Sequence, residues 1–173
     1  ELFGKKIQLL RRFRAMNILV VSQYFYPENF KINDLIFSLK KRGHQITVLT
    51  GKPNYSKTHF FEGYGWKSDD FETINDIPVY RANLFSRRNG GAFRLFLNYI
   101  SFAILASFKV RKIKGSFDAI FVYQTSPVTV GIPAIYAKKL FKAPIYFWVQ
   151  DLWPESLTAA GGGKNKLVLG FFN

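Results

Sequence analysis

The stretch Gln150–Glu155 (QDLWPE) places a carboxylate, an amide and an indole directly after an apolar run. The run Ile145–Val149 has the length and composition of a buried strand, so Asp151 is expected at its carboxyl end, part-buried between tryptophans. A carboxylate there can hydrogen-bond a ligand hydroxyl or accept its proton. Alternatively, Asp151 or Glu155 caps the following helix, where a negative charge complements the helix dipole. The residues alone leave both interpretations open.

The elements that position this turn follow from the hydrophobic pattern. Strands are expected at 17–22, 45–50, 72–74, 77–82, 118–123 and 143–149, and helices at 32–42, 93–113 and 128–141. The two strands around Asn75 and Asp76 are expected to form a hairpin at the sheet edge. Alternating apolar strands and helices predict an α/β fold, a Rossmann-like parallel sheet of buried strands with helices on both faces.

Ligands of parallel sheets bind beyond the carboxyl ends of the strands. The loops at 23–33, 51–56, 124–127 and 150–155 are therefore expected to share one rim. Within the first of these loops, Lys31 and Asn33 fall near the first turn of a helix, where free N–H groups attract anions. A simple capping role for this turn is the alternative.

Several kinds of site are excluded by the residues that are missing. The chain has no cysteine, which rules out disulfides, cysteine–zinc sites and thiol nucleophiles. No G-x-G-x-x-G follows the first strand, and Gly161–Lys164 (GGGK) lacks the Ser or Thr that ends a phosphate-binding P-loop. The two histidines, His44 and His59, make no metal site, and no G-x-S-x-G is present.

The net charge of +14 is concentrated in two places. Segments 1–15 and 84–115 hold twelve basic residues and one acid, so the remainder is close to neutral. Localised positive charge favours an anionic partner, either phospholipid or nucleic acid. The aromatic residues mostly fit strand and helix patterns, and no RNA-binding motif is present, so nucleic acid ranks below a membrane.

The segment 93–113 is apolar enough that it could be a core helix, a membrane-surface helix or a membrane-spanning helix. Its uncharged stretch, Leu95–Phe108, would span about 21 Å as a helix, which is less than the roughly 30 Å of hydrocarbon in a bilayer. One expectation is a buried crossover helix. The alternative is that this helix, besides covering the sheet, also inserts exposed apolar side chains into a membrane surface. The basic residues expected to contact that surface are Arg87, Arg88, Arg94, Lys109, Arg111 and Lys112.

The ends of the chain are interpreted separately. Residues 1–15 precede Met16 and are expected to be an extension, either upstream or tag sequence, or a short basic amphipathic helix. The domain is expected to run from residue 16 to residue 173, and Lys164–Asn173 is expected to begin another helix.

Three stretches together carry a resemblance to a known family. They are Asn17–Glu28 (NILVVSQYFYPE), Arg42–Thr50 (RGHQITVLT) and Gln150–Pro154 (QDLWP). In this order they resemble the N-terminal domain of family 4 glycosyltransferases, which are retaining enzymes of the GT-B fold. The nearest type is the L-fucosamine transferase of bacterial O-antigen, lipopolysaccharide and capsule assembly.

The resemblance implies a substrate and a site. This half would bind a polyprenyl-diphosphate-linked sugar acceptor, and the C-terminal half a nucleotide sugar, UDP-linked, with no cofactor and no metal. The catalytic residue would be Asp151, which would orient or deprotonate the acceptor. The other residues expected to line the acceptor site are Asn29, Phe30, Lys31, Asn33, Lys52, Asn54, Tyr55, Gln124, Ser126, Gln150, Trp153 and Glu155.

Two departures from the family qualify this expectation. The loop after the first strand lacks the Gly-Gly pair of many relatives, and Gln150 stands where many have histidine. The donor-binding residues of the family belong to a C-terminal domain outside residues 16–173. We therefore expect a transferase of amino sugars to lipid-linked glycans, peripheral on the cytoplasmic face of the plasma membrane, whose N-terminal domain is inactive alone. The alternatives are a non-catalytic membrane-surface module and, third, an RNA-binding domain.

Overall fold

The computed structural model describes residues 14–55, 59–88, 91–125 and 127–151. The expectations for residues 1–13, for Ser126 and for everything from Leu152 onward lie outside the described residues. The elements, in chain order, are β1 (Asn17–Ser22), α2 (Lys31–Lys41), β2 (Gln45–Gly51), β3 (Phe71–Ile74), β4 (Ile77–Ala82), α3 (Ala92–Lys109), β5 (Ala119–Gln124), α4 (Gly131–Phe141) and β6 (Ile145–Val149).

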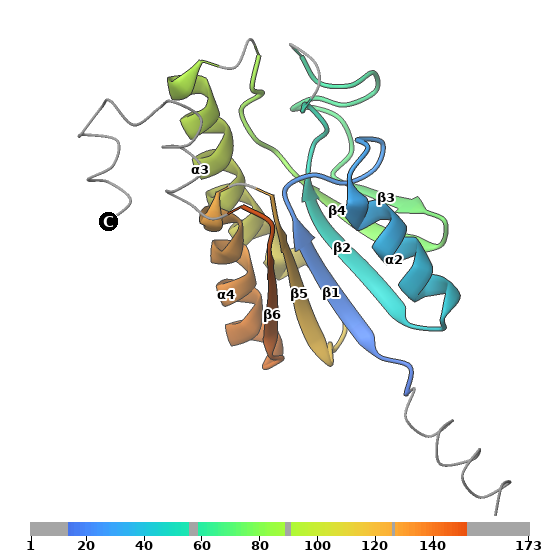
Figure 1. The fold of residues 1–173 in the computed structure, drawn as a ribbon. Coiled ribbons are helices and arrows are strands. Elements are labelled where there is room, and N and C mark those ends of the chain that lie inside the picture. Colours follow the sequence, from blue (N-terminus) through green and yellow to red (C-terminus); the bar gives the residue numbers. More distant parts are fainter. Residues whose placement is uncertain (1–13, 56–58, 89–90, 126, 152–173) are drawn as a thin grey trace, which may run out of the picture.

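The strands form one sheet in the order β3-β4-β2-β1-β5-β6. All neighbouring strands are parallel except β3, which pairs antiparallel with β4 at the edge. Figure 1 shows α3 and α4 side by side on one face of the sheet and α2 on the other. The predicted Rossmann-like sheet, with helices on both faces and a hairpin at its edge, is confirmed.

Two hydrophobic clusters explain why the central strands are apolar without alternation. Leu19 and Val21 of β1 pack with Phe102 of α3 on one face, whereas Ile18 and Val20 pack with Ile36 of α2 on the other. Successive side chains of a strand point to opposite faces. A strand covered on both faces must therefore be apolar at every position.

Two predicted helices are shorter in the structure, because each carries a 3₁₀ turn at one end. The predicted helix 93–113 ends as α-helix at Lys109 and continues as the turn Val110–Lys112. The predicted helix 128–141 begins with the turn Val128–Val130 before α4. Gly43 follows the C-terminal end of α2 with a φ of 91°, a left-handed conformation that glycine adopts without strain at the end of a helix.

The prediction that the last strand is buried was wrong. Tyr146, Phe147, Trp148 and Val149 of β6 are all exposed by more than a third. The reason is position: within the described residues, β6 is the edge strand beside β5, and α4 packs against it. Apolar composition predicts a strand, but burial depends on what covers it.

Candidate functional site

The carboxyl ends of β1, β2, β5 and β6 lie at one edge of the sheet, because these strands are parallel. Hydrogen bonds join the loops in pairs: the Gly51 amide donates to the Gln23 carbonyl at 3.0 Å, and the Gln150 amide to the Gln124 carbonyl at 2.9 Å. The expectation that these loops share a rim is confirmed for the described residues.

Glu28 ties the first two loops together. Its side chain is buried, and its Oε1 accepts the backbone N–H groups of Asn54 and Tyr55, each at 2.6 Å. The Glu28 carbonyl in turn accepts the Asn33 side-chain amide at 2.7 Å. Asn33, which was predicted to line the acceptor site, is itself buried, and its hydrogen bond to Glu28 stabilises the loop after β1.

A cluster of aromatic rings lies above this junction. The rings of Tyr24, Phe30 and Tyr55 contact one another, with centroids 4.9 to 5.0 Å apart. Tyr55 is 48% exposed, whereas Tyr24 is buried. Of the residues predicted here from the sequence, Phe30 and Tyr55 therefore lie together, and Tyr55 faces solvent.

The Arg87 guanidinium lies over the ring of Tyr55, with 4.4 Å from Cζ to the centroid. This residue was predicted to contact a membrane, which stays a prediction; in the structure its side chain lies against the rim aromatics. Burial against them follows from the path of the loop before α3, which sequence patterns do not show.

Asn54 is the polar centre of the same region and is fully buried. Its Oδ1 accepts the Arg87 backbone N–H and the Asn98 side-chain amide, both at 3.1 Å. The Asn98 Oδ1 accepts the Gln23 amide at 2.7 Å. Gln23 and Asn98 are therefore rim-supporting residues that the sequence did not single out, because 75 positions separate them.

Lys52 differs from its expected role. Its side chain is buried, and its ammonium donates to the carbonyls of Gly65 and Ser68. Burial lowers the pKa of Lys52, although the nearby Asp70 opposes this change. Lys52 therefore supports the 59–70 loop through these two hydrogen bonds, and its predicted contact with a ligand stays a prediction.

At the other end of the rim, Asp151 lies beside Gln124 and Gln150. The Gln124 Nε2 donates to the Asp151 carbonyl at 3.0 Å, and the Gln124 side chain is buried. Asp151 is exposed rather than part-buried as expected. Its carboxylate is thus open to a ligand. It also raises the pKa of nearby Tyr123, after the larger effect of burial.

Of the remaining predicted residues, two are exposed near the start of α2 and two lie outside the described residues. Asn29 and Lys31 are exposed. Lys31 is the first residue of α2, and the N-cap residue before it, Phe30, makes no side-chain capping hydrogen bond. Trp153 and Glu155 lie outside the described residues. Within those residues, no group of three or more His, Asp or Glu side chains gathers as a metal site would require.

Glu28 has the clearest electrostatic signature in the site. Burial raises the pKa of its carboxyl from 4.5 to about 7, although the N–H groups of Tyr55 and Asn54 and the charge of Arg81 lower it in part. Its Oε2 is buried and has no hydrogen-bond partner among the described residues. The carboxyl therefore carries a proton in mildly acidic solution and loses it near neutrality.

This shift predicts a pH dependence of folding. Since the folded carboxyl holds its proton up to about pH 7 and the unfolded one releases it near 4.5, the free energy of unfolding should fall as pH rises across that window. The full effect corresponds to about 3 kcal/mol. Glu28→Gln keeps an oxygen for the two N–H bonds and cannot ionise, so it should remove this slope. Urea denaturation of both proteins between pH 5 and 8 measures the difference, and parallel curves would contradict the assignment.

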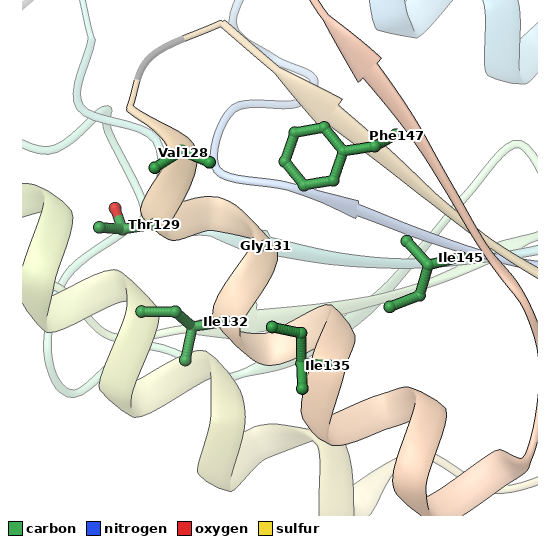
Figure 2. Close-up of a pocket in the computed structure, with 7 residues that line it drawn as sticks. All are labelled: Val128, Thr129, Gly131, Ile132, Ile135, Ile145 and Phe147. Carbon is green, nitrogen blue, oxygen red and sulfur yellow. The ribbon is translucent and has the colours of Figure 1, made fainter. Parts of the chain in front are cut away.

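An apolar cavity of about 330 Å³ lies away from these polar groups, between the edge strand and α4. Figure 2 shows Val128, Ile132 and Ile135 on one side of it, and Ile145 and Phe147 of β6 on the other. A Cβ at Gly131 would come within 2.7 Å of the Phe147 ring, so glycine there allows the ring to pack on the helix. Among the described residues, Thr129 is the polar residue in this lining, and the other six are apolar.

Comparison with known proteins establishes the class of fold. No family model matches the sequence, and neither does any curated protein. Among solved structures, the chain is similar to the catalytic domain of Starch Synthase IV from Arabidopsis thaliana bound to ADP and acarbose, with a TM-score of 0.52 and 13% identity. The match covers 78% of this chain and 34% of that one, so the chain spans about a third of that protein's length. At this identity the likeness shows the fold, a Rossmann-like domain matching one half of a GT-B enzyme.

Proposed function

We propose that this chain is the acceptor-binding domain of a retaining glycosyltransferase. The observation that carries the proposal is the rim itself. An exposed carboxylate, Asp151, lies at the carboxyl edge of a Rossmann-like sheet, and the Gln124 side chain donates to its backbone carbonyl. The fold likeness to a starch synthase catalytic domain supports glycosyl transfer as the general chemistry.

The rim suits a sugar hydroxyl that must be oriented and activated. Asp151 would accept a hydrogen bond from the acceptor hydroxyl and take its proton as the new bond forms. Gln124 anchors the backbone of Asp151 and so holds this turn in place. The reaction would move a glycosyl group from a nucleotide sugar to that hydroxyl, with the nucleoside diphosphate as leaving group.

The sequence resemblance supports a narrower substrate class. The donor would be a UDP-linked N-acetylated amino sugar, and the acceptor a sugar on a polyprenyl diphosphate, used for O-antigen or another surface polysaccharide. A second domain would hold most of the donor, and the domain described here would bind the acceptor.

The test is a transfer assay on the enzyme that includes a donor-binding domain. Radiolabelled UDP-N-acetylamino sugars are offered with polyprenyl-diphosphate-linked sugars, and lipid-extractable label is counted. We expect label in the lipid fraction with both domains and none with residues 1–173 alone. Transfer by residues 1–173 alone would contradict the assignment to an acceptor half, and no transfer to any lipid-linked sugar would contradict the substrate class.

A specific surface favours association with a membrane as a companion role. Phe93, Ile104 and Phe108 project from α3 with exposures of 71%, 50% and 60%. The inward face of the same helix instead carries buried Asn98 and Ser101. By length and composition α3 could cross a bilayer, but Phe102 and Ala106 pack it into the core, so we treat it as part of the domain.

The neighbouring helix extends this apolar surface and adds charge. Ile135 and Leu140 of α4 are exposed by about half, and the exposed Lys138, Lys139 and Lys142 lie on or beside that helix. Residues 119–150 contain no acid. Apolar side chains flanked by cations bind anionic lipid surfaces. Of the basic residues predicted for this role, Arg88, Arg111 and Lys112 are exposed, whereas Lys109 is mostly buried and pairs with Asp70.

Vesicle sedimentation tests this surface. We expect binding to vesicles containing phosphatidylglycerol, weaker binding to phosphatidylcholine alone, and about a tenfold loss when Ile104 and Phe108 are both changed to serine. The control is Tyr146→Ser, which removes an exposed ring from β6. Because Ile145 and Phe147 of β6 face α4, Tyr146 points to the other face of the sheet, away from α3 and α4. Equal binding to both lipids, or equal losses in both variants, would contradict the proposal.

A further inference from the structure

Arg87 occupies an unusual position on the rim, held by three tyrosine rings. Its Cζ lies 4.4 Å from the ring centroid of Tyr55, 5.9 Å from that of Tyr24 and 6.0 Å from that of Tyr99. Its Nη1 also donates to the Tyr24 hydroxyl at 3.4 Å. The rings come from the loops after β1 and β2 and from α3, so the tertiary fold builds this setting.

Arg87 differs from two other cations of the domain, Arg81 and Lys109, whose charges are each paired with a carboxylate. Arg81 pairs with Glu72, and Lys109 pairs with Asp70. Within the described part of the chain, no carboxylate forms a salt bridge with Arg87. Aromatic faces stabilise a guanidinium while leaving its charge intact, so Arg87 keeps a full positive charge where ligands of this fold bind.

The backbone of Arg87 is fixed by a buried network. Its N–H donates to the Asn54 Oδ1 at 3.1 Å, and Asn98 donates to the same oxygen and, at 2.7 Å, to the Phe85 carbonyl. The Gln23 amide donates to Asn98, and the Gln23 Oε1 is buried without a partner among the described residues. A guanidinium held on a fixed backbone loses less entropy when it binds a ligand.

We propose that Arg87 binds the phosphate or diphosphate group of the ligand that occupies the rim. A guanidinium presents paired N–H donors that match two phosphate oxygens. The anion site stands on this geometry alone. Only the carrier of the phosphate, a nucleoside diphosphate or a polyprenyl diphosphate, rests on the proposed function.

Isothermal titration with inorganic pyrophosphate, UDP and geranyl diphosphate tests the site at about 0.15 M salt, where surface charges are screened beyond about 8 Å. The variants are Arg87→Gln and Arg87→Lys, and the matched control is Arg88→Gln, which removes the same charge from the exposed neighbouring residue. We expect Arg87→Gln to weaken pyrophosphate binding at least about tenfold, Arg87→Lys less, and Arg88→Gln less than about twofold.

A second measurement needs no variant. Phenylglyoxal labelling followed by mass spectrometry should show Arg87 protected by pyrophosphate and Arg88 unprotected. Equal losses in Arg87→Gln and Arg88→Gln, or labelling of Arg87 unchanged by pyrophosphate, would overturn the proposal.

The two diphosphate ligands then identify the carrier. Arg87-dependent binding of geranyl diphosphate assigns the site to the acceptor, and Arg87-dependent binding of UDP assigns it to the donor. Either result supports the anion site, and it does so even if the transfer assay fails.

Discussion

Changing Asp151 to asparagine in the enzyme that carries both domains is expected to lower turnover by about 100-fold or more. The exposed carboxylate is the group on the described rim that can take a proton from an acceptor hydroxyl beside Gln124. An amide of the same shape still accepts a hydrogen bond but cannot serve as a base at neutral pH. The fall should therefore appear mainly in kcat, with the acceptor KM changed little.

Folding should be unaffected, because Asp151 is exposed and its carbonyl, not its side chain, accepts the Gln124 bond. Asp118→Asn is the matched control. Asp118 is also an exposed carboxylate, but it lies just before β5, at the amino ends of the strands and away from the rim. There its Oδ2 accepts the backbone N–H of Asn17. Steady-state kinetics of both variants decide the matter, and unchanged turnover in Asp151→Asn would remove this residue from the mechanism.

The largest effect on stability is expected from Arg81→Ala, which should lower the free energy of unfolding by about 3–5 kcal/mol. Arg81 is fully buried, and its guanidinium pairs with Glu72. It also donates to the carbonyls of Gly51 and Tyr26. Removing it would take a donor from the carbonyls of Gly51 and Tyr26, and would leave Glu72 with the Tyr64 hydroxyl as its donor among the described residues.

Chemical denaturation measures this change, with Arg88→Ala as the control because Arg88 is exposed. That control should alter stability by less than about 0.5 kcal/mol. Glu72→Gln, which keeps an acceptor oxygen for Arg81 but removes the ion pair, should fall between the two. A loss below about 1 kcal/mol for Arg81→Ala would mean that the buried pair contributes little to holding the rim.

The two parts of the rim are therefore expected to respond to different substitutions. The part around Glu28, Tyr55 and Arg87 joins the loops after β1 and β2, whereas Asp151 stands with Gln124 at the loops after β5 and β6. A ligand that carries both a diphosphate and a sugar hydroxyl offers chemistry for each part. Loss of binding in Arg87 variants and loss of turnover in Asp151 variants would separate them.

Local patterns were sufficient to predict the fold. The apolar run at 17–22 is β1 at the same bounds, and the hairpin around Asn75 and Asp76 is present at the edge of the sheet. Period and turn residues act over a few positions, so they can be identified without a structure. Because all parallel strands end at one edge, the shared rim followed from the strands alone.

The chemistry of individual side chains depended on contacts between distant segments. Lys52, which was predicted to bind a ligand, donates to two loop carbonyls, and Arg87, which was predicted to contact lipid, lies on tyrosine rings. Both predicted roles stay predictions, but the contacts themselves could not be expected from the sequence. Glu28 was not predicted as a site residue from its position in a loop. It is nevertheless buried and accepts hydrogen bonds from the backbone N–H groups of Asn54 and Tyr55, which lie 26 and 27 positions away. Burial and partners set the charge and reach of a polar group. For these three residues, both arise from how the loops pack together at the rim, which strand and helix periodicity does not encode.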